Sequence, residues 1–277
     1  MHEWGSDIAH RRNWIDTCLD LGIDCFDHAD IYGGMTCEAL FGDVVRESPS
    51  RRDRMTLISK CGIRLPGTSA DPSIPALTNK VYDTTLAHIL RSVDNSLSRL
   101  GTDRLDVLLL HRPDPLMDPE AVAAAFTRLH ASGKVRFFGV SNFPPSSLDL
   151  LASRLPMSLV TNQIELSAWH HGAMRDGILD QCLVRRIRPM AWSPLGSGRV
   201  NEPSPVRNTL LDVAQELGAS VEATALSWLL RHPSGPVPIL GSGRIDRIRD
   251  QARSMELPMD ASQWFRIYEA GLPGGLP

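Results

Sequence analysis

The amino-acid sequence predicts an α/β protein with a parallel sheet, built as a single domain over residues 1–277. The main observation is a repeated alternation of short apolar runs and amphipathic stretches, with no linker between them. A second is the strongly apolar run Leu105–Leu110, which is typical of a strand buried on both faces. The third is size, because 277 residues that are 42% apolar can fill one large core.

The expected elements follow from hydrophobic periodicity and end signals. Asp7 is placed to cap a first helix over Ile8–Leu21, and Ser220 to cap a later one. Strands are expected over Ile23–Phe26, Met55–Lys60, Leu105–Leu110, Val135–Val140, Leu159–Gln163, Ile187–Trp192 and Pro236–Leu240. Further helices are expected over Cys37–Arg46, Asp83–Leu100, Pro119–Ser132, Ser146–Arg154, Met174–Arg185, Arg207–Leu217, Val221–Arg231, Ile245–Met255 and Ala261–Ala270.

One stretch has no such periodicity. Gly62–Asn79 is rich in Gly, Pro, Ser and Thr, so we expect a loop that lies over an opening.

Composition argues against several classes of function. The net charge is −3 with no basic block, so nucleic acid is not an expected partner. The apolar runs are too short to span a bilayer, and the first seven residues contain no apolar secretion segment. Five cysteines, with no CxxC pair, favour a reduced protein. We therefore expect a cytoplasmic protein that acts on a small molecule, and the sequence indicates no oligomeric state.

Polar residues gather where the expected strands end, which is where parallel α/β proteins place their chemistry. Asp27 and Tyr32 follow the first strand, and Lys60 and His111 end the next two. A phenol acts as a general acid only if a nearby cation lowers its pKa from about 10. Lys60 could supply that charge, with Asp27 keeping the lysine protonated.

Each of these residues also has a structural interpretation. Lys60 could extend to the surface along its aliphatic stem, and His111 could be an ordinary buried histidine. Asp30 lies in the same loop, where we expect it to cap or to form a turn.

Seven motifs carry a resemblance to a known family. The chain resembles the aldo-keto reductases, in particular a bacterial subgroup of predicted oxidoreductases. The motifs run in the family's order over most of the chain: Phe26–Gly33 (FDHADIYG), Leu57–Lys60 (LISK), Leu108–Asp114 (LLLHRPD), Val135–Phe143 (VRFFGVSNF), Asn162–Ser167 (NQIELS), Ala191–Gly196 (AWSPLG) and Pro238–Arg247 (PILGSGRIDR).

The resemblance implies a (β/α)8 TIM barrel, yet only seven strands are expected here. The missing strand should precede the first helix, where the family has a hairpin and a strand that ends beside the nicotinamide. Compared with the family, the chain lacks roughly twenty residues there, about a hairpin plus one strand. The start could be assigned too late, or the chain could be a fragment or a degenerate copy.

The resemblance also implies the reaction, which is reduction of an aldehyde or ketone to an alcohol by hydride from NADPH. Asp27, Tyr32, Lys60 and His111 match its four catalytic positions. Tyr32 would give the proton, Lys60 and Asp27 would tune Tyr32, and His111 would orient the carbonyl oxygen. No metal is required.

The cofactor argument rests partly on the residues themselves. A G-x-G-x-x-G fingerprint after an early strand is absent. Two similar segments, Leu195–Val200 and Leu240–Ile245, follow the last two expected strands, where barrels commonly bind phosphate. Both segments could equally be ordinary glycine turns.

The resemblance then assigns the cofactor contacts. Ser141, Asn142 and Gln163 match residues that bind the nicotinamide carboxamide, and Trp192 matches the aromatic ring that stacks on it. The remaining positions face the phosphates and adenine: Ser193, Leu195, Gly241, Ser242, Gly243, Arg244, Arg247 and Gln251. A basic residue is common at the position of Gly241 and is absent here. NADPH remains favoured over NADH. Without the family, Trp192 would be interpreted as a core aromatic and Gln163 as part of a strand-end turn.

Three other functions stay open. The chain could be a cofactor-binding regulatory subunit, or an inactive truncated homologue. A metal-dependent barrel hydrolase is a further alternative, but its early strand should offer His-x-His, whereas this one offers Asp27, His28 and Asp30. His170 and His171 are adjacent after a later strand, with no third metal ligand at a suitable spacing.

Overall fold

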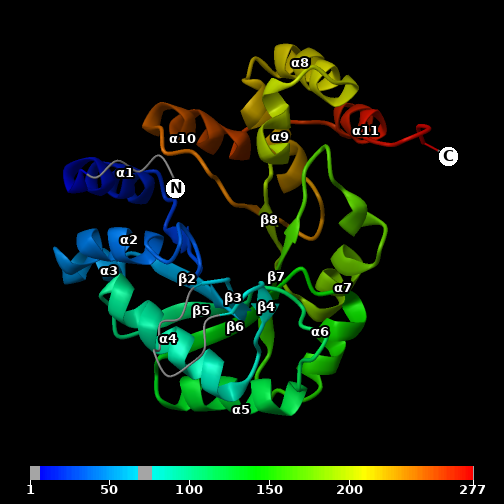
Figure 1. Cartoon of the computed structure of the whole chain (residues 1–277). Coiled ribbons are helices and arrows are strands. Elements are labelled where there is room, and N and C mark those ends of the chain that lie inside the picture. The colour runs from blue at the N-terminus through cyan, green and yellow to red at the C-terminus, as the bar shows by residue number, and fades with distance from the viewer. Residues whose placement is uncertain (1–6, 68–76, 277) are drawn as a thin grey trace. The chain divides into compact units, whose positions relative to one another are not determined.

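The structure, a computed structural model, describes residues 7–67 and 77–276 (Figure 1). The chain forms two compact units, one up to Val160 and the other from Thr161 onward. The single domain expected over residues 1–277 remains a prediction.

The first unit contains four parallel strands in the order β1 (Cys25–Asp27), β2 (Thr56–Cys61), β5 (Leu105–Leu110) and β6 (Val135–Ser141). The register pairs Asp27 with Ile58, and Lys60 with Leu109. All four were expected, and their ends differ from the expected ones by at most two residues. Parallel pairing brings the carboxyl ends of these strands to one edge of the sheet.

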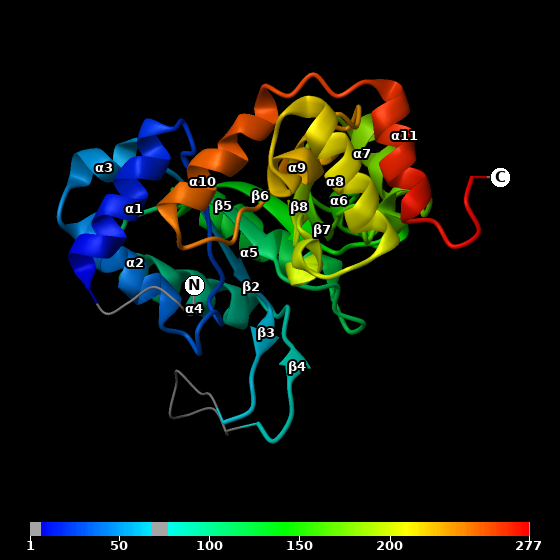
Figure 2. The ribbon, with the colours of Figure 1, turned by 90° about the horizontal axis from the view of Figure 1, so that it is seen from above.

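The helices of this unit begin at side-chain caps where the sequence supplies them. They are α1 (Ile8–Asp20), α2 (Cys37–Arg46), α3 (Pro49–Asp53), α4 (Leu86–Leu100), α5 (Pro119–Ala131) and α6 (Pro145–Ala152). The Asp7 side chain caps α1, as predicted. The cap of α4 is Thr85, whose hydroxyl accepts from the His88 N–H, so this helix begins three residues later than expected. Figures 1 and 2 show α2, α4 and α5 following one another along one side of these strands.

The expected loop Gly62–Asn79 contains part of a hairpin that the sequence did not indicate. Strand β3 (Ile63–Arg64) pairs antiparallel with β4 (Val81–Tyr82), directly beyond the carboxyl end of β2. Figure 2 shows this hairpin projecting away from the strands of the unit. Residues 68–76 of the expected loop lie outside the described residues.

The second unit contains three parallel strands in the order β7 (Leu159–Glu165), β8 (Met190–Trp192) and β9 (Val237–Pro238). Strand β7 begins two residues before the boundary between the units. Five α-helices follow or separate these strands: α7 (Ile178–Arg185), α8 (Pro205–Leu217), α9 (Val221–Leu230), α10 (Ile245–Ala252) and α11 (Ala261–Ala270). Ser220 caps α9, as predicted, by accepting from the Ala223 N–H.

The core of the second unit is built around Trp228, which is fully buried on α9. Its indole stacks on that of Trp264 from α11, with ring centroids 5.2 Å apart. Each indole N–H donates to the other residue's backbone carbonyl oxygen at 3.0 Å. Figures 1 and 2 both show α8, α9 and α11 packed side by side. The pair of reciprocal bonds fixes the position of α11 on α9.

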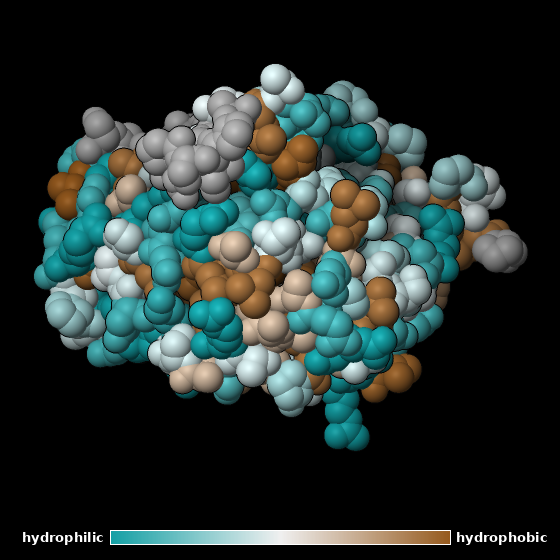
Figure 3. All heavy atoms as spheres, turned by 60° about the horizontal axis from the view of Figure 1, so that its bottom comes forward, coloured by the Kyte–Doolittle hydropathy of each residue, from teal (hydrophilic) through white to brown (hydrophobic). Residues whose placement is uncertain are grey.

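Seven parallel strands are therefore present in the two described stretches, as the sequence predicts. From residue 7 onward no strand precedes α1, and β1 has one hydrogen-bonded neighbour, β2. None of the helices in the described part is long and apolar enough to cross a membrane. On the face that Figure 3 shows, hydrophilic residues surround smaller hydrophobic patches, which is the usual mixture at a protein surface.

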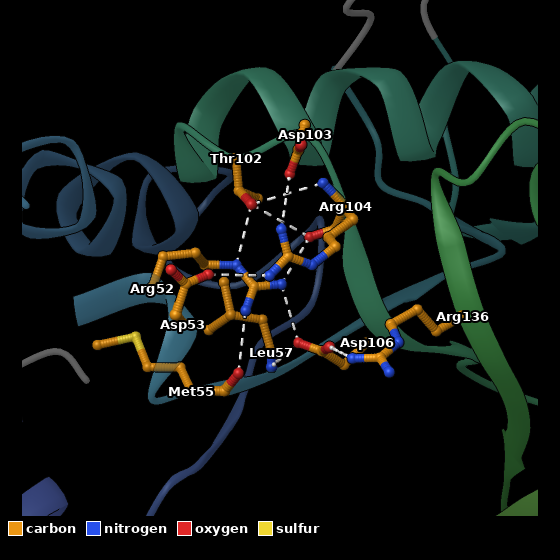
Figure 4. Close-up of polar contacts among 9 residues, drawn as sticks. All are labelled: Arg52, Asp53, Met55, Leu57, Thr102, Asp103, Arg104, Asp106 and Arg136. Carbon is orange, nitrogen blue, oxygen red and sulfur yellow. Dashed lines mark hydrogen bonds and ion pairs between the residues drawn. The ribbon is translucent and has the colours of Figure 1, made fainter. Parts of the chain in front are cut away.

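One polar residue interrupts the otherwise apolar strand β5. Asp106 is 7% exposed, and its carboxylate accepts from the Arg52 guanidinium at 2.8 Å and from the Leu57 N–H at 2.9 Å. Arg52, from α3, also donates to the carbonyl oxygens of Met55 and Arg104, each at 2.9 Å. Figure 4 shows the two charged groups pointing toward each other. The ion pair thus joins α3 to both β2 and β5.

We expect Asp106→Ala to lower the free energy of unfolding by roughly 3 kcal/mol, because it leaves a buried guanidinium without its counter-charge. Urea unfolding followed by circular dichroism measures the change. Asp103→Ala is the matched control, since Asp103 is 84% exposed and pairs with Arg104 at the surface, where ion pairs contribute little. A loss of stability in Asp106→Ala no larger than that in the control would contradict the structural role given to this pair.

Candidate active site

The Lys60 side chain is completely buried at the end of β2, so it does not extend to the surface. Its ammonium group donates to Asp27 Oδ2 at 2.6 Å, to the His28 carbonyl oxygen at 2.9 Å and to the Tyr32 hydroxyl oxygen at 3.1 Å. A lysine ammonium has three N–H donors, and these three acceptors satisfy all of them. The ammonium therefore fixes both the Asp27 carboxylate and the Tyr32 hydroxyl.

The chain makes a tight turn directly after β1, and this turn places the Tyr32 side chain next to Lys60. The Tyr32 N–H donates to the Ala29 carbonyl oxygen at 3.1 Å, and the next residue, Gly33, has a φ of 59°. A Cβ atom built at Gly33 would lie 2.5 Å from Cys37 Sγ. Glycine is favoured at that position, because its φ lies in the left-handed region and a side chain would displace Cys37.

Charge and burial act in opposite directions on Lys60. Burial alone would lower its pKa, but the negative charge of Asp27, together with Tyr32, outweighs burial and raises it. The ammonium also lies 4.7 Å from the centroid of the Tyr32 ring. Lys60 is consequently a positive charge at neutral pH, placed against a phenol.

His111 follows β5 and is 7% exposed. Its ring centroid lies 5.7 Å from that of Tyr32, with the ring planes at 79°. Burial, and then the charges of Lys60, Arg112 and Lys80, lower the pKa of His111 to about 3. The imidazole is therefore neutral near pH 7, with one nitrogen carrying a proton and the other free of one.

Two further predicted residues end strand β6 in the same unit. Ser141 is buried, and Asn142 has a φ of 59°, an uncommon conformation that its side chain supports by donating to Ser141 Oγ at 2.7 Å. The four predicted catalytic residues, together with Ser141 and Asn142, thus lie at the carboxyl ends of the adjacent strands β1, β2, β5 and β6 or in the loops that follow them.

The second unit holds the other predicted cofactor residues at the carboxyl ends of its own strands. Gln163 is buried on β7, and Trp192 is half-buried at the end of β8. Ser193 and Leu195 lead into a short 3₁₀ segment, Gly196–Asn201, and the Ser193 hydroxyl bonds the Ser197 hydroxyl at 2.8 Å. A Cβ at Gly196 would lie 2.9 Å from the Trp169 ring, so this loop packs closely on that indole.

The segment between β9 and α10 carries the remaining predicted residues. Gly241, Ser242 and Gly243 lie in its irregular stretch, where Ser242 Oγ accepts from the Arg244 N–H at 3.1 Å. Arg244 and Arg247 are both exposed at the start of α10, and Arg244 Nε donates to Asp246 at 3.1 Å. Gln251 is buried at the other end of this helix, and its Oε1 atom has no hydrogen-bond partner among the described residues.

Sequence reasoning missed a buried polar layer next to Lys60. It contains Asp30, Glu38, Ser59 and Ser92. Asp30 does lie in a turn, as expected, but its carboxylate is buried and accepts from Ser92 of α4. One signal was present, because Ser92 falls on the buried stripe of α4 beside Ile89 and Val93. A serine on such a stripe indicates a buried partner without identifying it.

Over residues 7–67 and 77–276, no group of three His, Cys, Asp or Glu side chains is placed to hold a metal ion. The two adjacent histidines point to different environments: His170 is exposed, whereas His171 is buried, with its ring centroid 4.8 Å from that of Tyr268.

Comparison with known proteins identifies the family. The model of the aldo/keto reductase family matches residues 2–271. The chain belongs to the aldo/keto reductase family.

Relatives and a solved structure of aldo/keto reductases agree with this. An uncharacterized oxidoreductase of Bacillus subtilis, YcsN, is 48% identical over 98% of this chain and 91% of its own length. A 6-dehydroglucose reductase of Agrobacterium fabrum is 43% identical over 94% of this chain and 87% of its own. The crystal structure of the thermostable aldo-keto reductase Tm1743, in complex with the inhibitor epalrestat, superimposes with a TM-score of 0.82 at 26% identity, covering 96% of this chain and 89% of that one.

These likenesses confirm the predicted fold class, an α/β protein of the TIM-barrel kind, with seven of its eight strands in the described part of the chain. As a member of the aldo/keto reductase family, the protein is an oxidoreductase that uses NAD(P)H.

The buried ammonium predicts how His111 titrates. In the wild type we expect the His111 ring signals to stay those of neutral imidazole from pH 8 down to about 5, because burial and Lys60 hold the pKa at about 3. In Lys60→Met the His111 pKa should rise, since a nearby positive charge is lost, but remain below 6.5 because the ring is still buried. Imidazole NMR titration, assigned with His111→Asn, measures both.

Lys134→Met serves as the control, because Lys134 is a partly exposed lysine whose partner is Asp94. It should leave the His111 titration unchanged. Titration of His111 near pH 6.5 in the wild type would show that the ring is more hydrated than its 7% exposure implies.

Proposed function

We propose that this protein is an NADPH-dependent reductase that converts an aldehyde or ketone to an alcohol, with Tyr32 as the proton donor. The observation that carries the proposal is the buried Lys60 ammonium, which binds the Tyr32 hydroxyl oxygen and the Asp27 carboxylate together. A buried lysine–carboxylate pair alone could be structural. A phenol hydroxyl as the third partner, with a neutral imidazole beside it, is a proton-transfer arrangement.

The residues of the first unit divide the chemistry between them. When bound, the reduced nicotinamide supplies the hydride that reaches the carbonyl carbon. The Tyr32 hydroxyl gives its proton to the carbonyl oxygen, and the phenolate left behind is stabilised by the Lys60 ammonium 3.1 Å away. Asp27 keeps that ammonium charged. His111, being neutral, donates one N–H to the same carbonyl oxygen and orients it.

Each unit contains residues whose groups suit part of a dinucleotide. In the first unit Ser141 and Asn142 offer hydroxyl and amide groups for a carboxamide. In the second unit Gln163 offers an amide group and Trp192 an aromatic face. Gln251, near the end of α10, is the residue proposed to meet adenine. Ser193, Leu195, Gly241, Ser242 and Gly243 lie in loops after β8 and β9, where backbone N–H groups can bind phosphate.

The preference for NADPH rests on Arg244 and Arg247. Both are exposed at the first turn of α10, where a guanidinium group and the helix N-terminus both favour an anion. The 2′-phosphate distinguishes NADPH from NADH and is the anion proposed to bind there.

The relative from Agrobacterium fabrum suggests which carbonyl compounds to test first. That protein is named a 6-dehydroglucose reductase, and it is 43% identical to this chain. We propose that the substrate is a small polar carbonyl compound. Sugar-derived aldehydes should therefore be the first compounds tested as substrates.

Tyr32→Phe should abolish carbonyl reduction while leaving NADPH binding nearly unchanged, because it removes the proton and little of the ring's packing. Steady-state rates, with NADPH binding measured by quenching of tryptophan fluorescence, give both quantities. Tyr82→Phe is the control, since Tyr82 lies on β4 with 37% of its surface exposed. Retention of most of the rate in Tyr32→Phe would remove Tyr32 as the donor.

Arg247→Ala should weaken binding of NADPH at least about tenfold more than binding of NADH, because it removes a guanidinium from the proposed 2′-phosphate site. Comparing the two dissociation constants measures the effect. Arg249→Ala removes another exposed arginine of the same helix and should change neither constant. Equal weakening of both cofactors by Arg247→Ala would argue against a 2′-phosphate contact.

A further inference from the structure

The side chain of Asp30 is buried next to the proposed catalytic residues but belongs to none of the roles given above. It is 8% exposed, and its Oδ2 accepts from the Ser92 hydroxyl of α4 at 2.6 Å. The Glu38 carboxylate is also buried. It accepts hydrogen bonds from the Ser59 hydroxyl at 2.6 Å and from the Arg99 guanidinium at 3.2 Å. These groups form a second polar layer beside β2.

Asp30 is held at three of its atoms. Its N–H donates to the carbonyl oxygen of Lys60 at 3.1 Å, and its own carbonyl oxygen accepts from the Arg99 guanidinium at 3.2 Å. Together with the Ser92 bond, these contacts attach the loop after β1 both to the backbone of Lys60 and to helix α4.

The position of the Tyr32 hydroxyl depends on how the loop after β1 is attached to the rest of the unit. Tyr32 lies two residues after Asp30, and the two residues that follow it, Gly33 and Gly34, both have positive φ. Glycine pairs give a loop little stiffness of their own. Bonds hold the loop on both sides of Tyr32: the Cys37 N–H donates to the Tyr32 carbonyl oxygen at 3.3 Å and the Thr36 hydroxyl to that of Gly33 at 2.7 Å, while Asp30 holds the amino-terminal side. Of the Asp30 bonds, only the one from Ser92 involves its side chain.

A buried carboxylate is a costly way to hold a loop. Burial raises the pKa of Asp30 to about 7, against the opposing effects of Ser92 and Arg99, while the Glu38 carboxylate of α2 raises it further. Asp30 Oδ1 has no hydrogen-bond partner among the described residues. Lys60 and Cys61 of β2 are the nearby titratable groups on the strand side. An apolar residue would avoid this cost but could not accept the Ser92 hydroxyl.

We propose that Asp30, held by Ser92 and Arg99 of α4, is a positioning residue that sets the Tyr32 hydroxyl against the Lys60 ammonium. The inference rests on the proposed function, in which Tyr32 donates the proton. Asp30 acts through Tyr32 and not on the substrate, so its loss should affect the chemical step and spare binding.

The kinetic test compares three variants with the wild type. Asp30→Ala should lower kcat at least about tenfold with little change in KM, because a small displacement of a reacting group strongly slows the chemical step. Ser92→Ala should lower kcat in the same direction by a smaller factor. Asp30→Asn, which keeps an oxygen acceptor for Ser92, should recover most of the rate that Asp30→Ala loses.

Ser96→Ala is the matched control for Ser92→Ala, because Ser96 is a buried serine one turn further along α4. It should leave kcat unchanged. Unfolding midpoints of all variants are measured alongside. If Asp30→Ala does not fold, the comparison of Ser92→Ala with Ser96→Ala decides, and equal rates in those two variants would overturn the proposal.

A readout without turnover separates this inference from the proposed function. The chain has three tyrosines, so ¹³C-tyrosine labelling gives three ring signals, with the Tyr32 signal assigned by Tyr32→Phe. In the cofactor-free protein, Asp30→Ala should shift the Tyr32 signal and leave those of Tyr82 and Tyr268 in place. An unchanged Tyr32 signal would contradict the positioning role of Asp30, whatever value of kcat is measured. A shifted Tyr32 signal in a protein whose wild type reduces no carbonyl compound would support positioning and count against the proposed function.

Discussion

A lysine ammonium in a water-free interior is tolerated only when acceptors meet all of its N–H groups and an anion balances its charge. Lys60 meets both conditions, through Asp27, the His28 carbonyl oxygen and Tyr32. The acceptors come from the end of β1 and from the loop that follows it, so β1, this loop and β2 must keep their register. A one-residue slip of β1 would turn Asp27 away and leave a buried charge without a partner.

Elements with a clear hydrophobic pattern or a side-chain cap could be predicted from the sequence because these signals are local. Helices α2 and α11 and strand β5 have the expected bounds, and the caps at Asp7 and Ser220 are where they were expected. The short elements could not be found in this way. Helix α3 has five residues, and β3 and β4 have two each, which is too short for either hydrophobic pattern to repeat. Asp106 in β5 is a different case, since its burial is explained by partners far along the chain, among them Arg52, 54 residues away.

For the site, the order of the motifs indicated Asp27, Tyr32, Lys60 and His111, and the structure brings these side chains together. What the residue pattern could not supply is the support behind them. Asp30 looks like a turn residue in its local context, because its partners Ser92 and Arg99 are more than sixty positions further along the chain. Local spacing reveals which face of a helix is buried, but the partner across the interface depends on how helices and strands pack.

The stacked indoles of Trp228 and Trp264 have an optical consequence. Two such chromophores 5.2 Å apart and inclined by only 13° couple their electronic transitions, so their ultraviolet circular dichroism differs from the sum of two isolated indoles. The coupling vanishes when α11 leaves α9, because both rings belong to helices that are joined there by the reciprocal N–H bonds. Undocking of the last helix is therefore expected to change the ultraviolet circular dichroism, a signal that needs no added label.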